Sequence, residues 1–224
     1  MVQDGGPPVA TATREVRRCF NLPPDAPEDE RRFDLGGRLF GGWWERFPKD
    51  RRAAIRIEGE PIADLDFKAM FVRLAYLEAG LAPPLDATVD LYALPGFSGE
   101  QQREGVKKVA LALMFRSSPL VRLPKDCKGL LPPSIAATQV RKAILAAYPA
   151  LAPVFEKGIG LRLMFVESQI LVAALLRLAD QGIAALPMHD GIMCAKSKAD
   201  QVKLAMEDAA DQITGYRLPV ARKA

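Results

Sequence analysis

The feature that most constrains the fold is a pair of short apolar runs on either side of the turn His189-Asp190-Gly191. The runs IAALPM and IMCAK are short, and two such runs around a tight turn are typical of a β-hairpin. The turn also holds the only histidine of the chain, next to a carboxylate. An ordinary turn residue would explain this histidine, whereas a functional role requires a second carboxylate elsewhere in the sequence.

Such a carboxylate occurs in the segment PIADLDF, which spans 61–67 and is predicted to be a strand that directly precedes a helix at 68–80. Asp64 and Asp66 are two residues apart, so both project from one face of a strand. Aspartate is unfavourable inside strands, so the pair needs an explanation. One explanation is that the two residues lie on an exposed face or in a turn. The other is that they bind a metal at the end of the strand. Asp66 would meet Asp190 if the two strand elements are neighbours.

The composition is that of an ordinary globular protein, with 49% hydrophobic and 26% charged residues among 224. The net charge of +4 permits a polyanionic partner without requiring one. Three widely separated cysteines argue against a disulfide framework and a zinc knuckle, and a single histidine excludes a His-rich metal site. Any catalytic metal is therefore expected to be Mg²⁺ or Mn²⁺, held by carboxylates.

We expect a cytoplasmic protein without a membrane partner. The first residues lack the apolar core of a signal peptide, and the apolar segment 170–178 is too short to span a bilayer and contains Arg177. The separated cysteines fit a reducing compartment.

Residues 1–30 are rich in Pro, Gly, Asp and Glu, which predicts a loosely ordered N-terminal arm with one short helix at 13–20. Residues 31–224 are expected to form the folded part, of α+β class, with one small antiparallel sheet. Trp43 and Trp44 are expected to pack in a core under the neighbouring glycine-rich loop. A further strand is predicted at 53–58, and further helices at about 101–115, 136–148, 161–181 and 199–213.

The predicted helix QQREGVKKVALALMF carries Arg103, Lys107 and Phe115 on one side, at intervals of four and eight residues. Two cations one turn apart could hold a triphosphate, and an aromatic ring beyond them could pack against a base or sugar. A solvated basic edge on an amphipathic helix is the simpler explanation when this helix is considered alone.

Taken in order, these segments resemble the motifs of family A DNA polymerases. PIADLDFKAMFVRLA resembles the first carboxylate motif, REGVKKVALALMF resembles the nucleotide-binding helix, and LPMHDGI resembles the third, His-Asp motif. The upstream FDLGGRLF is also similar to the single-subunit RNA polymerases of phage and mitochondrial type. The likeness extends from about Phe33 to the end of the chain.

The resemblance implies a compact palm, whose small antiparallel sheet is packed by helices, with reduced helical fingers at about 100–150. It implies that Asp66 and Asp190 are the catalytic residues and the ligands of Mg²⁺ or Mn²⁺. The residues implied to bind the nucleotide are Arg103, Lys107, Phe115 and Phe71. The residues implied to contact primer or template are His189, Arg38, Arg73, Glu167 and Gln169.

The activity implied is a nucleotidyltransferase that adds nucleoside triphosphates to a 3′-hydroxyl, on primer-template DNA or a DNA/RNA hybrid, in a phage or mobile element with a possible replication partner protein. Phe71 stands where the DNA polymerases have a glutamate that excludes ribonucleotides, so the choice between dNTPs and NTPs stays open. Gly191 replaces another glutamate, which leaves two main carboxylates. The alternatives are a catalytically inactive, nucleic-acid-binding relative, and a helical interaction domain in which Asp66 and Asp190 lie far apart.

Overall fold

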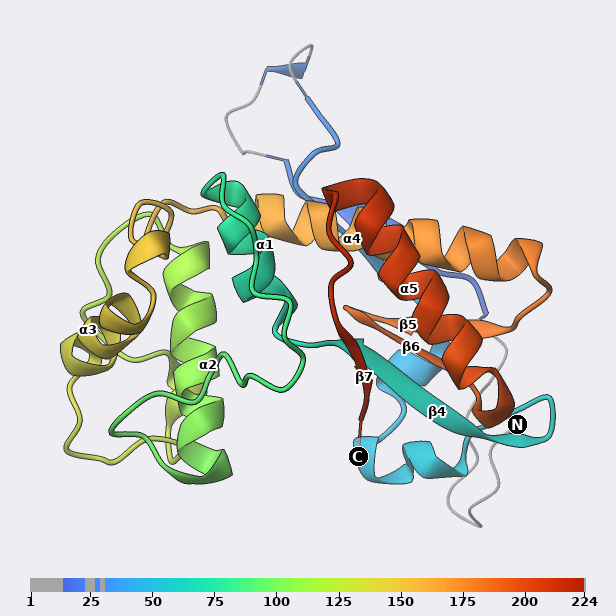
Figure 1. Ribbon diagram of the computed structural model, residues 1–224, viewed down its shortest axis with the longest axis horizontal. Helices are drawn as coiled ribbons and strands as arrows, with labels where there is room; N and C mark the ends of the chain where they lie inside the picture. The colour runs from blue at the N-terminus through green and yellow to red at the C-terminus, as the bar shows by residue number, and fades with distance from the viewer. Residues whose placement is uncertain (1–13, 23–26, 29–30, 224) are drawn as a thin grey trace. The chain divides into compact units, whose positions relative to one another are not determined.

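The computed structural model describes residues 14–22, 27–28 and 31–223 (Figure 1). The chain divides into two compact units, one formed by 1–68 together with 164–224 and the other by 69–163. The predicted α+β class is confirmed, since the described residues form a small antiparallel sheet and several helices.

The main sheet of the first unit has the order β3 (Arg56–Ile57), β4 (Glu60–Phe67), β6 (Gly191–Ala195) and β5 (Ala185–Met188), with all neighbours antiparallel. The strand β7 (Val220–Arg222) also pairs with β4, antiparallel, over its last three residues. β4 is therefore the central strand, with β6 along one edge and both β3 and β7 along the other.

The two faces of the sheet have different neighbours because side chains alternate along each strand. The helix α5 (Ala199–Thr214) lies against β4, β6 and β7 (Figure 1). On the other face, Met193 and Ala195 belong to a buried cluster that includes Trp44, from the 3-10 helix η2 (Trp43–Arg46). The predicted core position of Trp44 is thus confirmed, and its ring is 2% exposed.

Asp64 and Asp66 lie on the same face as this cluster, because their cross-strand partners on β6 are Met193 and Gly191. The predicted strand at 53–58 is shorter than expected, since 49–54 forms the 3-10 helix η3 (Lys49–Ala54) and only β3 remains extended.

A second, two-stranded sheet pairs β1 (Arg17–Phe20) with β2 (Gly36–Phe40) in antiparallel register. The predicted helix at 13–20 is wrong over its described part, because the backbone of β1 bonds to β2 rather than to itself. Tertiary pairing of this kind outweighs the weak local preference of a four-residue segment. Most of the predicted N-terminal arm, residues 1–13, 23–26 and 29–30, lies outside the described residues.

The second unit contains three α-helices among the described residues, α1 (Met70–Glu78), α2 (Gly99–Phe115) and α3 (Ala137–Ala147). The helices α2 and α3 pack together through apolar faces. Their fully or almost fully buried residues include Val106, Val109, Leu113, Val140 and Ile144. The unit also contains the 3-10 helices η4 (Lys125–Cys127) and η5 (Pro149–Leu151).

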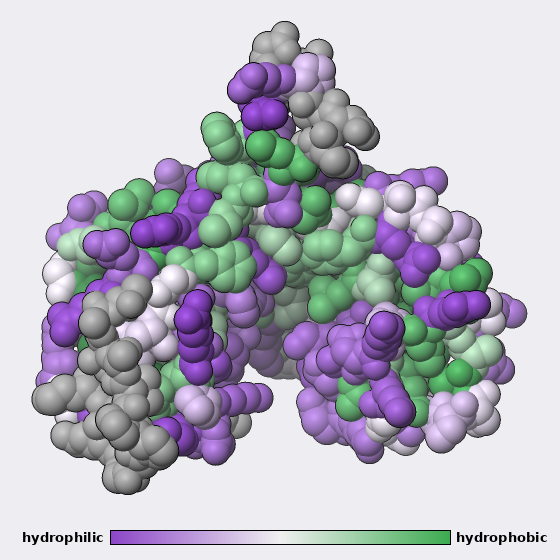
Figure 2. Space-filling view, turned by 180° about the vertical axis from the view of Figure 1, so that it is seen from behind, coloured by the Kyte–Doolittle hydropathy of each residue, from purple (hydrophilic) through white to green (hydrophobic). Residues whose placement is uncertain are grey.

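The helix α4 (Gly160–Asp180) begins at the end of the second unit and continues into the first. Hydrophilic residues cover much of the face of each unit seen in Figure 2, with apolar residues between them. Single exposed apolar side chains are normal on protein surfaces. None of the helices in the described parts of the chain is both long and apolar enough to cross a membrane.

Candidate active site

The predicted hairpin is confirmed as β5 and β6, with Met188 paired to Gly191 and a two-residue turn at His189-Asp190. His189 has a φ of 56°, in the left-handed region that few residues other than glycine adopt. Strained turn residues of this kind occur often at functional sites. The turn fixes the direction in which both side chains leave the hairpin.

Asp66 lies beside this turn. In the register of β4 and β6 it is paired with Gly191, and the backbone N–H of Phe67 donates to the carbonyl of Asp190 at 3.3 Å. The two aspartates that the motifs single out are therefore neighbours across the sheet. The alternative of a helical interaction domain required these two aspartates to lie far apart, and this expectation is wrong.

The environment of Asp66 disfavours its charged form. Burial raises the pKa of Asp66 to about 7, the carboxylate of Asp190 adds to this rise, and Lys223 opposes it. The Oδ1 atoms of Asp66 and Asp64 are buried without a hydrogen-bond partner among the described residues. Buried carboxylate oxygens without a partner are energetically unfavourable, and they are the kind of ligand that Mg²⁺ prefers.

Lys223 is a member of this cluster that the sequence analysis missed. Its Nζ lies 3.1 Å from Oδ2 of Asp66 and 3.6 Å from Oδ1 of Asp64. The sequence does not single out Lys223, because a three-residue strand such as β7 has no recognisable pattern of its own. The pairing of β7 with β4 is what brings the lysine to the aspartates.

A buried ion pair lies close to Asp190. Arg38 on β2 donates from Nε and Nη2 to the two carboxylate oxygens of Glu167 on α4, at 2.6 and 2.9 Å. The Glu167 side chain is fully buried, and burial raises its pKa to about 7, with Arg38 opposing and Asp190 reinforcing the rise. This bidentate pair holds the Arg38 guanidinium in one orientation.

The two other predicted primer or template residues of the first unit are His189 and Gln169. The His189 ring meets the Phe40 ring edge-on, with centroids 6.3 Å apart. Burial and the charge of Arg38 lower the pKa of His189. Gln169 is half-buried on α4, two residues after Glu167, so the two side chains leave the helix in different directions.

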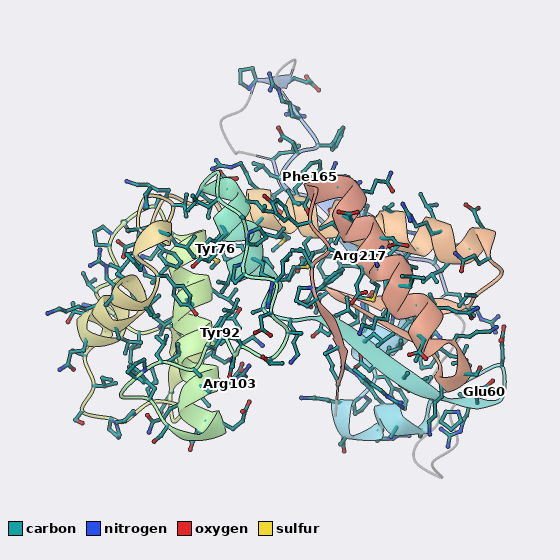
Figure 3. The ribbon with its side chains drawn as sticks, in the orientation of Figure 1. Glu60, Tyr76, Tyr92, Arg103, Phe165 and Arg217 are labelled. Atoms are coloured by element: carbon teal, nitrogen blue, oxygen red, sulfur yellow. The ribbon has the colours of Figure 1, made fainter. Side chains whose placement is uncertain are left out.

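In the second unit, the predicted basic pair lies along α2. Arg103 contacts Asp90 with two nitrogens and Glu100 at 3.2 Å, and its guanidinium lies 5.7 Å from the centre of the Tyr92 ring (Figure 3). The Nζ of Lys107 lies 3.8 Å from a carboxylate oxygen of Glu104, in the preceding turn of the helix. Both cations are partly exposed, and each has an acidic neighbour.

The aromatic pair predicted for the nucleotide also meets within this unit. The rings of Phe71 on α1 and Phe115 at the end of α2 are stacked, with centroids 5.7 Å apart. Arg73, predicted to contact primer or template, is fully buried and donates to the backbone carbonyls of Pro84 and Asp86. In this structure Arg73 holds the loop after α1.

The donor set for a metal consists of few groups. No cluster of three or more His, Cys, Asp or Glu side chains with the geometry for a metal ion occurs among the described residues. Mg²⁺, however, commonly takes only one or two protein carboxylates and completes its shell with water and substrate phosphates. Asp66, whose buried Oδ1 has no hydrogen-bond partner among the described residues, and the neighbouring Asp190 fit such a site.

No protein-family model matches the chain, and no curated protein sequence matches it. Among solved structures the chain is similar to the POL domain of Pol1 from M. smegmatis, in a complex with DNA primer-template and dNTP, with 11% sequence identity and a TM-score of 0.46. The match covers 88% of this chain and 48% of that one, so this chain spans about half the length of its neighbour. A likeness of this size carries no argument about activity.

Proposed function

We propose that this protein is a metal-dependent nucleotidyltransferase that adds nucleoside triphosphates to a 3′-hydroxyl under template direction. The observation that carries the proposal is the juxtaposition of Asp66 on β4 with Asp190 at the hairpin turn, with a buried carboxylate oxygen that lacks a partner among the described residues. The order of the three motifs along the sequence supports the same activity.

Asp66 and Asp190 would hold Mg²⁺ or Mn²⁺, which when bound supplies charge stabilisation for the phosphates and activation of the attacking hydroxyl. Arg38, kept in place by Glu167, would contact a nucleic-acid phosphate through its guanidinium group. His189 lies in the same turn as Asp190 and would contact the primer end. Gln169, on the same helix as Glu167, would contact the template.

On α2, Arg103 and Lys107 would hold the triphosphate, since they stand one helical turn apart on one side. The triphosphate would compete with Asp90 and Glu100 for the Arg103 guanidinium. The stacked rings of Phe71 and Phe115 would shape the pocket for the sugar or base.

Arg73 would affect primer or template contacts indirectly, because its buried guanidinium holds the loop after α1. The partners proposed are primer-template DNA or a DNA/RNA hybrid, and a replication protein that would supply parts a compact polymerase lacks. The net charge of +4 fits a polyanionic partner. A cytoplasmic location and a phage or mobile-element origin belong to the same proposal.

A second candidate function is a polymerase-like protein that binds primed nucleic acid without extending it. Two contacts favour it: Lys223 neutralises the aspartates, and Arg103 is paired with Asp90. In such a protein the charged groups of the site would stabilise the fold, and the net positive charge of the chain would favour binding to nucleic acid.

Primer extension tests the proposal. Wild type, Asp190→Ala and the control Asp180→Ala are each given Mg²⁺ or Mn²⁺ with dNTPs or NTPs; Asp180 is an exposed aspartate at the end of α4. We expect extension by wild type and Asp180→Ala, and a loss of about 100-fold or more in Asp190→Ala, because charge stabilisation at the phosphates is lost. Absence of extension with either metal, alongside salt-sensitive binding of primed template, would select the second candidate.

A further inference from the structure

The last strand of the chain brings a lysine to the carboxylate cluster. β7 pairs with β4 so that Ala221 stands opposite Asp66, and the backbone N–H of Lys223 donates to the carbonyl of Asp64 at 2.8 Å. Since side chains alternate along a strand, Lys223 projects from the face that carries both aspartates, while Arg222 projects from the opposite face.

The ammonium group of Lys223 lies close to both aspartates. Lys223 Nζ lies 3.1 Å from Asp66 and 3.6 Å from Asp64. A Cβ at Gly191 would lie 3.5 Å from Nζ, 3.1 Å from Oδ1 of Asp66 and 2.6 Å from the backbone of the neighbouring strand. The glycine of the His-Asp-Gly turn thus leaves the space in which lysine and carboxylate meet.

We propose that Lys223 is a tethered counter-cation that takes the place of the divalent cation at Asp66, so that metal binding requires the ammonium group to leave. The inference rests on the proposed function, because that function assigns the metal to Asp66. Two cations within a few ångströms of one carboxylate repel each other, and partial burial strengthens the repulsion. Lys223 and a metal ion therefore compete for Asp66.

The position of Lys223 suits such an exchange. It follows the last residue of β7, its side chain is 40% exposed, and a flexible four-carbon stem carries the charge. The ammonium can therefore swing into solvent without breaking the pairing of β7 with β4. In the absence of metal it provides the positive charge that the buried carboxylates need.

Titration of the metal-free full-length protein with Mn²⁺ at low salt, followed by calorimetry, tests the inference. The variants are Lys223→Met and Lys223→Gln, and Arg222→Met is the matched control, one residue away on the opposite face of the strand. We expect both Lys223 variants to bind Mn²⁺ at least about tenfold more tightly than wild type, because a competing charge is gone. Arg222→Met should bind like wild type.

Melting temperatures give a second readout that does not depend on activity. In EDTA the Lys223→Met variant should melt below wild type, since the carboxylates lose their counter-charge, and Mn²⁺ should raise its melting temperature more than that of wild type. If Lys223→Met folds only when Mn²⁺ is present, that result would equally support the exchange of Lys223 for metal at Asp66.

Equal or weaker Mn²⁺ binding by both Lys223 variants would overturn the inference. The proposed function would stand in that case if wild type binds Mn²⁺ and Asp190→Ala does not. If none of the folded proteins binds Mn²⁺, the metal site is absent and both proposals fail.

Discussion

At the scale of single residues, the half-buried carboxyl group of Asp66 and the fully buried one of Glu167 have similarly raised pKa values but different surroundings. Asp66 faces another carboxylate and keeps one oxygen without a partner among the described residues, whereas both oxygens of Glu167 accept from Arg38. Burial is the largest cause in both cases. The surroundings of Asp66 are typical of a cation-binding site. Those of Glu167 are typical of a residue that holds a neighbouring arginine in place.

Because Arg38 is paired with buried Glu167, we expect removal of the arginine to lower the free energy of unfolding by an amount that depends on pH. Arg38→Met should lower the free energy of unfolding by about 3–5 kcal/mol at pH 8, because Glu167 is then buried without its counter-charge and is either ionised or protonated at an energetic cost. The loss should be smaller at pH 5. Urea denaturation at the two pH values measures the difference.

The sign follows from the pKa of Glu167, which is about 7 in the folded protein and raised from its ordinary 4.5. The folded state therefore binds more protons than the unfolded state between these values, and stability falls as pH rises through that window. Removing Arg38 raises the folded pKa further and widens the window. The double variant with Glu167→Gln is the control, and a loss of the same size at both pH values in Arg38→Met alone would contradict this account.

At the scale of elements, the site depends on strands that meet across long stretches of sequence. The 3-10 helix η2 is joined to the hairpin by Trp44, whose Nε1 donates to the carbonyl of Pro187 at 2.7 Å. This bond is buried, and it fixes β5 next to the core cluster on the aspartate face of the sheet. Packing behind the hairpin thereby supports the position of Asp190.

Trp44→Phe should therefore destabilise the protein by about 1–3 kcal/mol, since it leaves the buried carbonyl of Pro187 without its donor. The neighbouring Trp43 is only half-buried, so Trp43→Phe is a matched control with a smaller expected effect. Urea denaturation of the two variants provides the comparison, and equal losses would argue against a role for the Trp44 hydrogen bond.

The sequence predicted the elements whose signal is local. The helix expected at 101–115 is α2 (Gly99–Phe115), and the expected hairpin is formed by β5 and β6. Both could be predicted because an amphipathic period and a turn are each recognisable within one continuous segment of the sequence. β1 and β7 were not predicted as strands, since each is only a few residues long and is defined by a distant partner. Lys223 was missed for the same reason, whereas Asp66 and Asp190, which the motifs single out, are neighbours across the sheet.

At the scale of the whole molecule, the chain forms two compact units, and each carries some of the residues for which a functional role is proposed. The carboxylates, Arg38 and His189 belong to the first unit, while Arg103 and Lys107 belong to the second. Each part has the charge that its proposed ligand requires. The basic surplus of the chain also sets an expectation for binding to nucleic acid.

Binding of primed template should weaken steeply with salt, by roughly 100-fold between about 50 and 200 mM if about four phosphates are contacted. Arg38→Met should reduce the slope of log affinity against log salt by about one, because one phosphate contact is lost. Asp180→Asn should leave the slope unchanged. Fluorescence anisotropy with a labelled primer-template gives the slopes, and an affinity independent of salt would contradict a phosphate-binding surface.

The proposed function requires that Asp66 and Asp190 together hold a divalent cation. A crystal grown with Mn²⁺ and a non-hydrolysable nucleoside triphosphate, measured for anomalous scattering, tests this requirement. We expect an anomalous peak about 2.1 Å from an oxygen of each aspartate, with Lys223 displaced from Asp66. A peak elsewhere only, or a Lys223 ammonium still in contact with Asp66 and no peak beside it, would contradict the claim.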